Sequence, residues 1–183
     1  MAARQVAVLL LALAASLLVT CEAGKYNGQQ QLAAIRGALK SKNCKTFDGY
    51  LESTGFIKSL LPVLNDWNVT VLAPLDSAWK TDSAKKDMAD KKKAPQIIGY
   101  HFLVGRRAFK EMLRYKTGTQ MVALNYQMKM LNVRAPSGVV RLGASVGAKY
   151  TGKIVKPGLF TGKINIVHGV DTVIRPPWYQ GVK

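Results

Sequence analysis

Residues 69–79 read VTVLAPLDSAW, and this stretch decides the fold. Its first half is an apolar run typical of a buried strand. Pro74 should end that strand, because proline cannot donate a backbone hydrogen bond to a neighbouring strand. Asp76 suits the position that caps a helix beginning at Ser77, since its carboxylate can accept hydrogen bonds from free backbone amides. The stretch therefore predicts a strand at 69–73 followed at once by a helix.

Helix patterns fill the first part of the chain and strand patterns fill the last part. Helices are predicted at residues 30–40, 46–53, 55–64, 94–101 and 107–113, and further strands at 102–104, 120–124, 128–133, 139–142, 153–156, 164–167 and 172–174. Pro62 should shorten or bend the third helix. The charge-rich stretch 82–93 is predicted to be a solvated helix or loop. Helices followed by strands are typical of an α+β fold with a segregated sheet.

Two further stretches carry distinctive patterns. Residues 97–105 read IIGYHFLVG, and residues 164–177 read INIVHGVDTVIRPP, which predicts a pair of strands ending in Pro-Pro. Together with residues 69–79, and in this order, they resemble the fasciclin domain, a secreted or cell-surface adhesion module. Leu72 and Leu75 stand where the family pattern usually has Phe and Thr.

The resemblance implies one fasciclin-type domain of class α+β, with helices packed on a mixed, wedge-shaped β-sheet. It implies adhesion or matrix organisation without catalysis. In the family the Tyr–His pair, here Tyr100 and His101, matters for adhesion. The residues themselves favour a structural role that holds a helix against the sheet, with only Tyr100 exposing one end. The family's motif residues correspond here to Pro74, Asp76, Tyr100, His101, His168, Asp171, Pro176 and Pro177.

The beginning of the chain predicts an export signal that is removed. Arg4 precedes the apolar run 6–19, which is too short to cross a bilayer comfortably, and a cleavage site follows Ala23. A retained membrane anchor is the alternative. We expect a secreted protein without a membrane anchor, located in the extracellular space of the cell wall or matrix. The chain then divides into a signal peptide at 1–23, a short linker at 24–28, a fasciclin-like domain at 29–178 and a tail at 179–183.

The chain is strongly basic, with 27 Lys and Arg residues against 10 Asp and Glu and a formal net charge of +17. Beyond Glu111 the only acidic residue is Asp171, against eleven basic residues. Such a charge attracts polyanions, and for an exported protein we expect an acidic polysaccharide rather than nucleic acid. A matrix or cell-surface protein is another candidate partner. A secreted cationic protein that acts on anionic membranes or microbes is the alternative function. The candidate polyanion-binding residues are Lys149, Lys153, Lys156 and Lys163.

Few residues suit catalysis. The sequence has only two histidines, His101 and His168, and it lacks the spacings typical of a metal site or a nucleophile elbow. We therefore expect no enzyme activity, no catalytic residue, no metal and no cofactor. A secreted hydrolase that uses His168 and Asp171 is a remaining alternative.

Cys44 and Asn68 are candidate sites of covalent modification. Removal of the first 23 residues would leave Cys44 as the one cysteine, either partly buried at a helix entry or available for a bridge to another molecule. An internal disulfide would then be impossible, and stability would come from packing. Asn68, followed by Val69 and Thr70, forms a glycosylation sequon just before the first strand.

Overall fold

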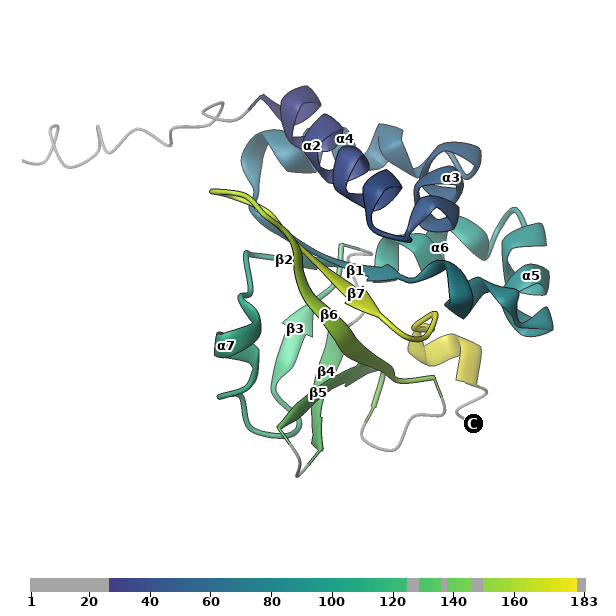
Figure 1. Ribbon diagram of the computed structural model, residues 1–183. Coiled ribbons are helices and arrows are strands. Elements are labelled where there is room, and N and C mark those ends of the chain that lie inside the picture. The colour runs from purple at the N-terminus through teal and green to yellow at the C-terminus, as the bar shows by residue number, and fades with distance from the viewer. Residues whose placement is uncertain (1–26, 125–128, 136–137, 146–149, 181–183) are drawn as a thin grey trace, which may run out of the picture.

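The computed structural model describes residues 27–124, 129–135, 138–145 and 150–180, and most of its helices gather on one side of the strands (Figure 1). The predicted signal peptide and Lys149 lie outside these described residues. The helices are α2 (Gly28–Ser41), α3 (Lys45–Ser53), α4 (Phe56–Asp66), α5 (Asp82–Ala89), α6 (Ala94–Tyr100) and the short α7 (Phe109–Met112), with two 3₁₀ helices, η1 (Asp76–Lys80) and η2 (Pro177–Gln180).

Seven strands form one mixed sheet in the order β2-β1-β7-β6-β5-β4-β3. Strands β1 and β7 run parallel, and every other neighbouring pair is antiparallel. A bridge between Leu103 of β2 and Ala123, next to β3, links the two ends of the sheet. The fold is therefore α+β, as predicted. The strands are β1 (Val69–Pro74), β2 (Phe102–Val104), β3 (Gln120–Val122), β4 (Lys129–Ala135), β5 (Val139–Gly143), β6 (Gly152–Thr161) and β7 (Ile166–Val170).

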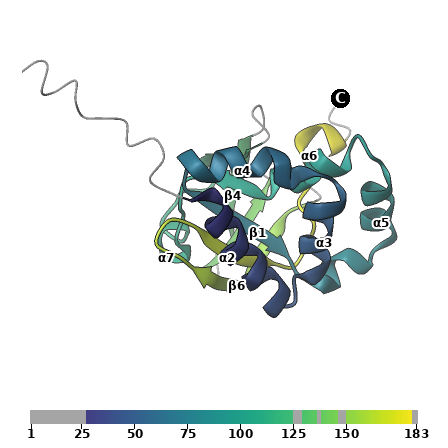
Figure 2. The ribbon, with the colours of Figure 1, turned by 90° about the horizontal axis from the view of Figure 1, so that it is seen from above.

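Strand β1 separates two hydrophobic cores. Seen from above, helices α2, α3 and α4 lie over this region (Figure 2). Val71 contributes to the core beneath the helices, together with Ile35 and Phe47. Leu72 contributes to the core on the other side, together with Leu142. Successive strand residues point to opposite faces, and all six residues of β1 are buried. Five of them are apolar, and the hydroxyl of Thr70, the one polar side chain, donates to the carbonyl oxygen of Gly105 at 2.7 Å.

Helix α4 does not stop at Pro62, so of the two effects predicted for this residue, to shorten or to bend the helix, the first is wrong. The helix continues to Asp66, with Pro62 inside it. Leu60 and Leu64 on either side of the proline are both buried in the core. Burial of these two leucines offsets the backbone hydrogen bond that proline cannot donate.

The predicted pair of closing strands is wrong in its second member. Residues 172–174 are not a strand, although Val173 and Ile174 are buried. The backbone N–H of Ile174 donates instead to Nε2 of His101, 3.0 Å away. A side chain thus takes the place of a neighbouring strand, and β7 pairs with β1 and with the long strand β6.

Candidate functional site

Asp76 joins the end of β1 to the start of helix α3. Its backbone N–H donates to the carbonyl oxygen of Asn43 over 2.8 Å, and its Oδ1 accepts from the backbone N–H of Thr46, also at 2.8 Å. Thr46 lies in the first turn of α3, where backbone amides have no partner within the helix. Asp76 therefore caps α3. The predicted cap of a helix at Ser77 is wrong, because η1 itself begins at Asp76 without a side-chain cap.

The buried side chain of His101 links helix α6 to the segment around Ile174 through hydrogen bonds. Nδ1 lies 2.8 Å from the carbonyl oxygen of Ile97. Since Nε2 accepts from Ile174, the proton must sit on Nδ1 and the ring must be neutral. Burial lowers the pKa of His101 to about 4. Tyr100 is also fully buried, so the prediction that its end is exposed is wrong.

His168 links the segment just before α7 to strand β6 in the same way. Its Nδ1 accepts from the backbone N–H of Gly158 at 3.0 Å, and Nε2 donates to the carbonyl oxygen of Arg107 at 2.9 Å. Burial lowers the pKa of this ring too. Asp171 instead accepts from the backbone N–H of Lys153 at 2.8 Å. Both ring nitrogens of both histidines are engaged by backbone groups, which leaves neither ring as a proton acceptor for a hydrolase.

Arg175 forms a buried ion pair that sequence reasoning missed. Its Nε lies 2.6 Å from Oδ2 of Asp87 in α5, and another guanidinium nitrogen donates to Ser83 at 3.0 Å. The guanidinium also lies over the ring of Tyr150, 4.0 Å from its centre. The motif prolines follow directly, Pro176 buried and Pro177 at the start of η2. These contacts attach the end of the chain to α5.

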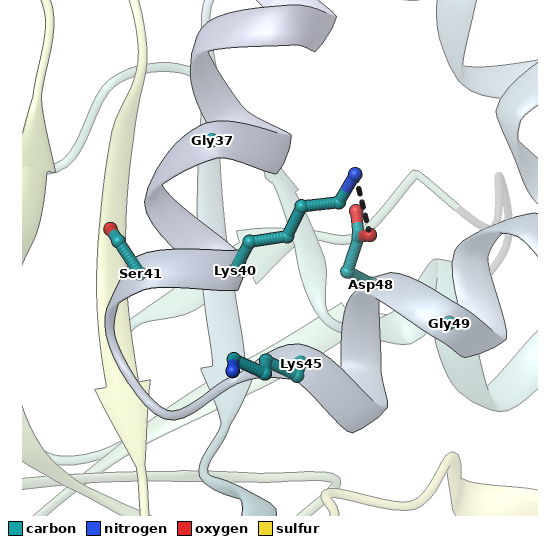
Figure 3. Close-up of a pocket in the computed structure, with 6 residues that line it drawn as sticks. All are labelled: Gly37, Lys40, Ser41, Lys45, Asp48 and Gly49. Carbon is teal, nitrogen blue, oxygen red and sulfur yellow. Dashed lines mark ion pairs between the residues drawn. The ribbon is translucent and has the colours of Figure 1, made fainter.

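A wide cleft of about 600 Å³ lies between α2 and α3. Gly37 and Gly49 line this cleft. A Cβ added to either glycine would meet no other atom within 4 Å, so the cleft is open at both positions. Lys40 reaches across it to Asp48, with Nζ 3.8 Å from Oδ2 (Figure 3). Asp48 also accepts from Arg36 at 2.6 Å. Asp48 therefore offsets the charge of Lys40, whereas Lys45, which also lines the cleft, has no ion-pair partner among the described residues.

A second pocket, of about 370 Å³, lies beside η1 and the α2–α3 turn. In the described part of the chain, neither of its two lysines, Lys80 and Lys156, forms an ion pair. Lys156 is one of the predicted polyanion-binding residues, whereas Lys80 was not predicted. The pocket is lined by Asn43, Leu75, Asp76, Ser77, Lys80 and Lys156.

The other predicted polyanion-binding lysines lie outside this pocket. Lys153 is partly buried near the start of β6, and Lys163 is exposed in the turn after β6. The sequon residue Asn68 is exposed, while Val69 and Thr70 are buried in β1. The structure therefore brings only Lys156 of the predicted set into a pocket, and it leaves the Asn68 side chain accessible.

Two further tests concern metal ions and membranes. Across the described ranges, no three His, Cys, Asp or Glu side chains come together as a metal site would need. Among the helices that the structure describes, none combines the length and apolar character required to cross a membrane.

Comparison with known proteins gives one family and one fold. The model of the fasciclin domain matches residues 42–176. Among solved structures, the chain resembles a FAS1 domain pair from the insect cell adhesion molecule fasciclin I, with a TM-score of 0.61 and 17% sequence identity. The match covers 76% of this chain and 47% of that one, so the chain spans about half of the domain pair. A search of curated proteins gives no match.

Proposed function

The chain belongs to the fasciclin domain family, and on that premise we propose that it is a secreted, non-catalytic module of cell adhesion or matrix organisation that binds acidic polysaccharide. Fasciclin domains generally occur in adhesion and extracellular proteins, and the similar solved structure comes from a cell adhesion molecule. The predicted signal peptide supports export. Amino-terminal sequencing of secreted material should find a first residue near Gly24.

The observation that carries the polysaccharide part of this proposal is the excess of accessible positive charge. The chain has a formal net charge of +17. Lys156 and Lys163 are exposed, and Lys153 is partly so. Within the described residues none of these three forms an ion pair. Accessible charges without partners attract polyanions and speed their association.

The absence of catalysis is supported by the two histidines. A general base needs a free ring nitrogen within reach of its substrate. His101 and His168 instead commit both nitrogens to backbone groups and lie buried. The side chains that would have formed a hydrolase site thus serve the fold.

Glycosylation at Asn68 fits the same extracellular setting. The side chain is exposed at the point where the chain enters β1. A glycan attached there would extend into solvent and leave the buried residues of the strand undisturbed. Loss of mass on treatment with an amidase that removes N-linked glycans, absent in Asn68→Gln, would identify it.

Binding measured at several salt concentrations tests the proposal. Screening shortens the reach of exposed charges from about 8 Å at physiological ionic strength to about 3 Å at 1 M. Binding to a polyuronate or a sulfated glycan should therefore weaken steeply as salt rises. A variant in which Lys149, Lys153, Lys156 and Lys163 all become Gln should bind more weakly with an almost unchanged melting curve.

A matched control removes four charges elsewhere. Lys58, Lys85, Lys91 and Lys92 are all exposed on or near helices, and their replacement by Gln lowers the net charge equally. We expect this control to bind better than the first variant. If the natural protein ignores acidic glycans at physiological salt, the proposal fails and the partner is to be sought among matrix or cell-surface proteins.

A further inference from the structure

The pocket beside η1 has a fixed rim. Asn43 in the α2–α3 turn has a left-handed backbone, with φ of 62°, a conformation that asparagine tolerates better than most residues. The turn is held by Asp76, which bonds the carbonyl oxygen of Asn43 and the amide of Thr46. The amide of Cys44 donates to Leu39 at 3.1 Å. The three contacts fix the rim before any ligand arrives.

The base of the Lys156 side chain lies close to the neighbouring strand β7. Lys156 lies opposite Gly169 of β7, and the pairing register shifts on both sides of it. Such irregularities in a ladder redirect side chains. A Cβ added at Gly169 would lie 3.0 Å from Cβ of Lys156 and 3.2 Å from a methyl carbon of Leu75. The glycine therefore lets the Cβ of Lys156 and the side chain of Leu75, both of which line the pocket, approach β7 closely.

The pocket carries more positive than negative charge. Its one acid, Asp76, already accepts a hydrogen bond from the backbone of α3, whereas Lys80 and Lys156 have no ion-pair partner in the described ranges. Lys42 and Lys45, which lie within two positions of Asn43 in the sequence, are both exposed, and Lys45 lines the α2–α3 cleft. In the α2–α3 cleft only one of the two lysines is unpaired, because Lys40 there is paired with Asp48.

Resting on the proposed function, we propose that this pocket holds one anionic sugar unit of the polysaccharide, with Lys80 and Lys156 binding its charged group. Its volume of about 370 Å³ falls in the range of small-molecule sites. Lysine ammonium groups suit a carboxylate or a sulfate. The amide of Asn43 and the hydroxyl of Ser77 supply donors and acceptors for the sugar hydroxyls.

Calorimetric titration with short oligogalacturonates tests this assignment. Lys80→Gln/Lys156→Gln should lower the affinity about tenfold, as expected if both charges contact the bound anion directly. Lys91→Gln/Lys92→Gln removes two exposed charges from the turn between α5 and α6 and should lower it by less than about twofold. Asn43→Gly keeps the left-handed turn accessible and removes the amide, so it should also weaken binding. Each variant is melted first to confirm that it folds.

The possible outcomes distinguish binding in the pocket from non-specific attraction by the net positive charge. If the natural protein binds neither oligogalacturonate nor a sulfated dextran, the proposed function itself fails. If it binds but the two double variants lose affinity equally, the charge acts as a diffuse field and the pocket assignment is overturned. Methyl-esterified oligogalacturonate has the same backbone without the charge, and equal binding of the ester would also overturn it. A preference between uronate and sulfate identifies the anionic group.

Discussion

His101 and His168 each replace a backbone partner that the fold does not otherwise provide. The ring of His101 links Ile97 to Ile174, and the ring of His168 links Gly158 to Arg107. One nitrogen donates and the other accepts in each case, which only a neutral imidazole can do. A proton added to His101 would put a second N–H against the N–H of Ile174. The folded protein therefore excludes that proton.

This requirement predicts a loss of stability in acid. The pKa of His101 is about 4 in the folded protein and about 6.5 in an unfolded chain. Between these values only the unfolded chain binds the proton, so the free energy of unfolding falls as pH falls. The contribution of His101 is complete above about pH 6.5, and roughly 3 kcal/mol of it is lost by pH 4. Urea unfolding at a series of pH values measures it.

His101→Gln provides the comparison, because an amide can donate and accept without titrating. We expect the variant to be less stable at pH 7 but to lose less stability on acidification than the natural protein. His168, whose pKa is also lowered, remains in both proteins. Equal pH slopes for the two proteins between pH 4 and 6.5 would show that His101 does not exclude the proton.

Helix α5 has a charged sequence, yet one of its charged residues is buried in an ion pair. Its sequence, DSAKKDMA, is that of a solvated helix, and Asp82 is indeed exposed. Asp87 is buried and paired with Arg175, 88 positions further along the chain. The prediction of a solvated segment was therefore only partly right. α5 is tied to the end of the chain by a contact between two charged groups that the solvent does not reach.

Two aspartates on this helix should therefore respond differently to the same change. Asp87→Asn leaves the buried guanidinium of Arg175 without its counter-charge, and loss of one partner of a buried pair costs about 3 kcal/mol or more. Asp82→Asn removes an exposed charge 3.8 Å from Lys85 and should cost less than about 1 kcal/mol. Chemical denaturation of both variants gives the two values. Similar small losses would mean that the Arg175 pair contributes little.

The elements were largely predictable because they depend on local patterns. The run at 69–73 and the patterns for α2, α3 and β2 identify these elements within a few residues. The contacts between elements were not predictable. Asp76 caps a helix 30 positions away. Lys80 and Lys156 line one pocket although 75 other residues separate them. Such pairings follow from the sheet order, including the parallel β1–β7 pair, which no local pattern encodes.

At the scale of the whole molecule, stability rests on two packed cores. Among the described residues the only cysteine is Cys44, which is free and fully buried. It joins the core beneath the helices, with Phe47 and Leu39 as fellow members. The predicted helix entry is confirmed, since Cys44 directly precedes α3, but the residue is fully buried where partial burial was predicted. Because this residue lies inside the larger core, its exposure requires that core to open.

Cys44 should therefore report the opening of the whole domain. Burial, with a smaller contribution from Asp76, raises the pKa of its thiol to about 11, and only the thiolate reacts readily. In protein that begins at Gly24, a thiol reagent at pH 8 should modify Cys44 slowly in the native state and rapidly in urea. The rate should rise with urea as steeply as global unfolding does. Ser77→Cys in a Cys44→Ala background exposes a thiol at η1 and should react at once. Fast modification of the natural protein in buffer, or a rate insensitive to urea, would show that the core opens locally around Cys44 without the rest of the domain.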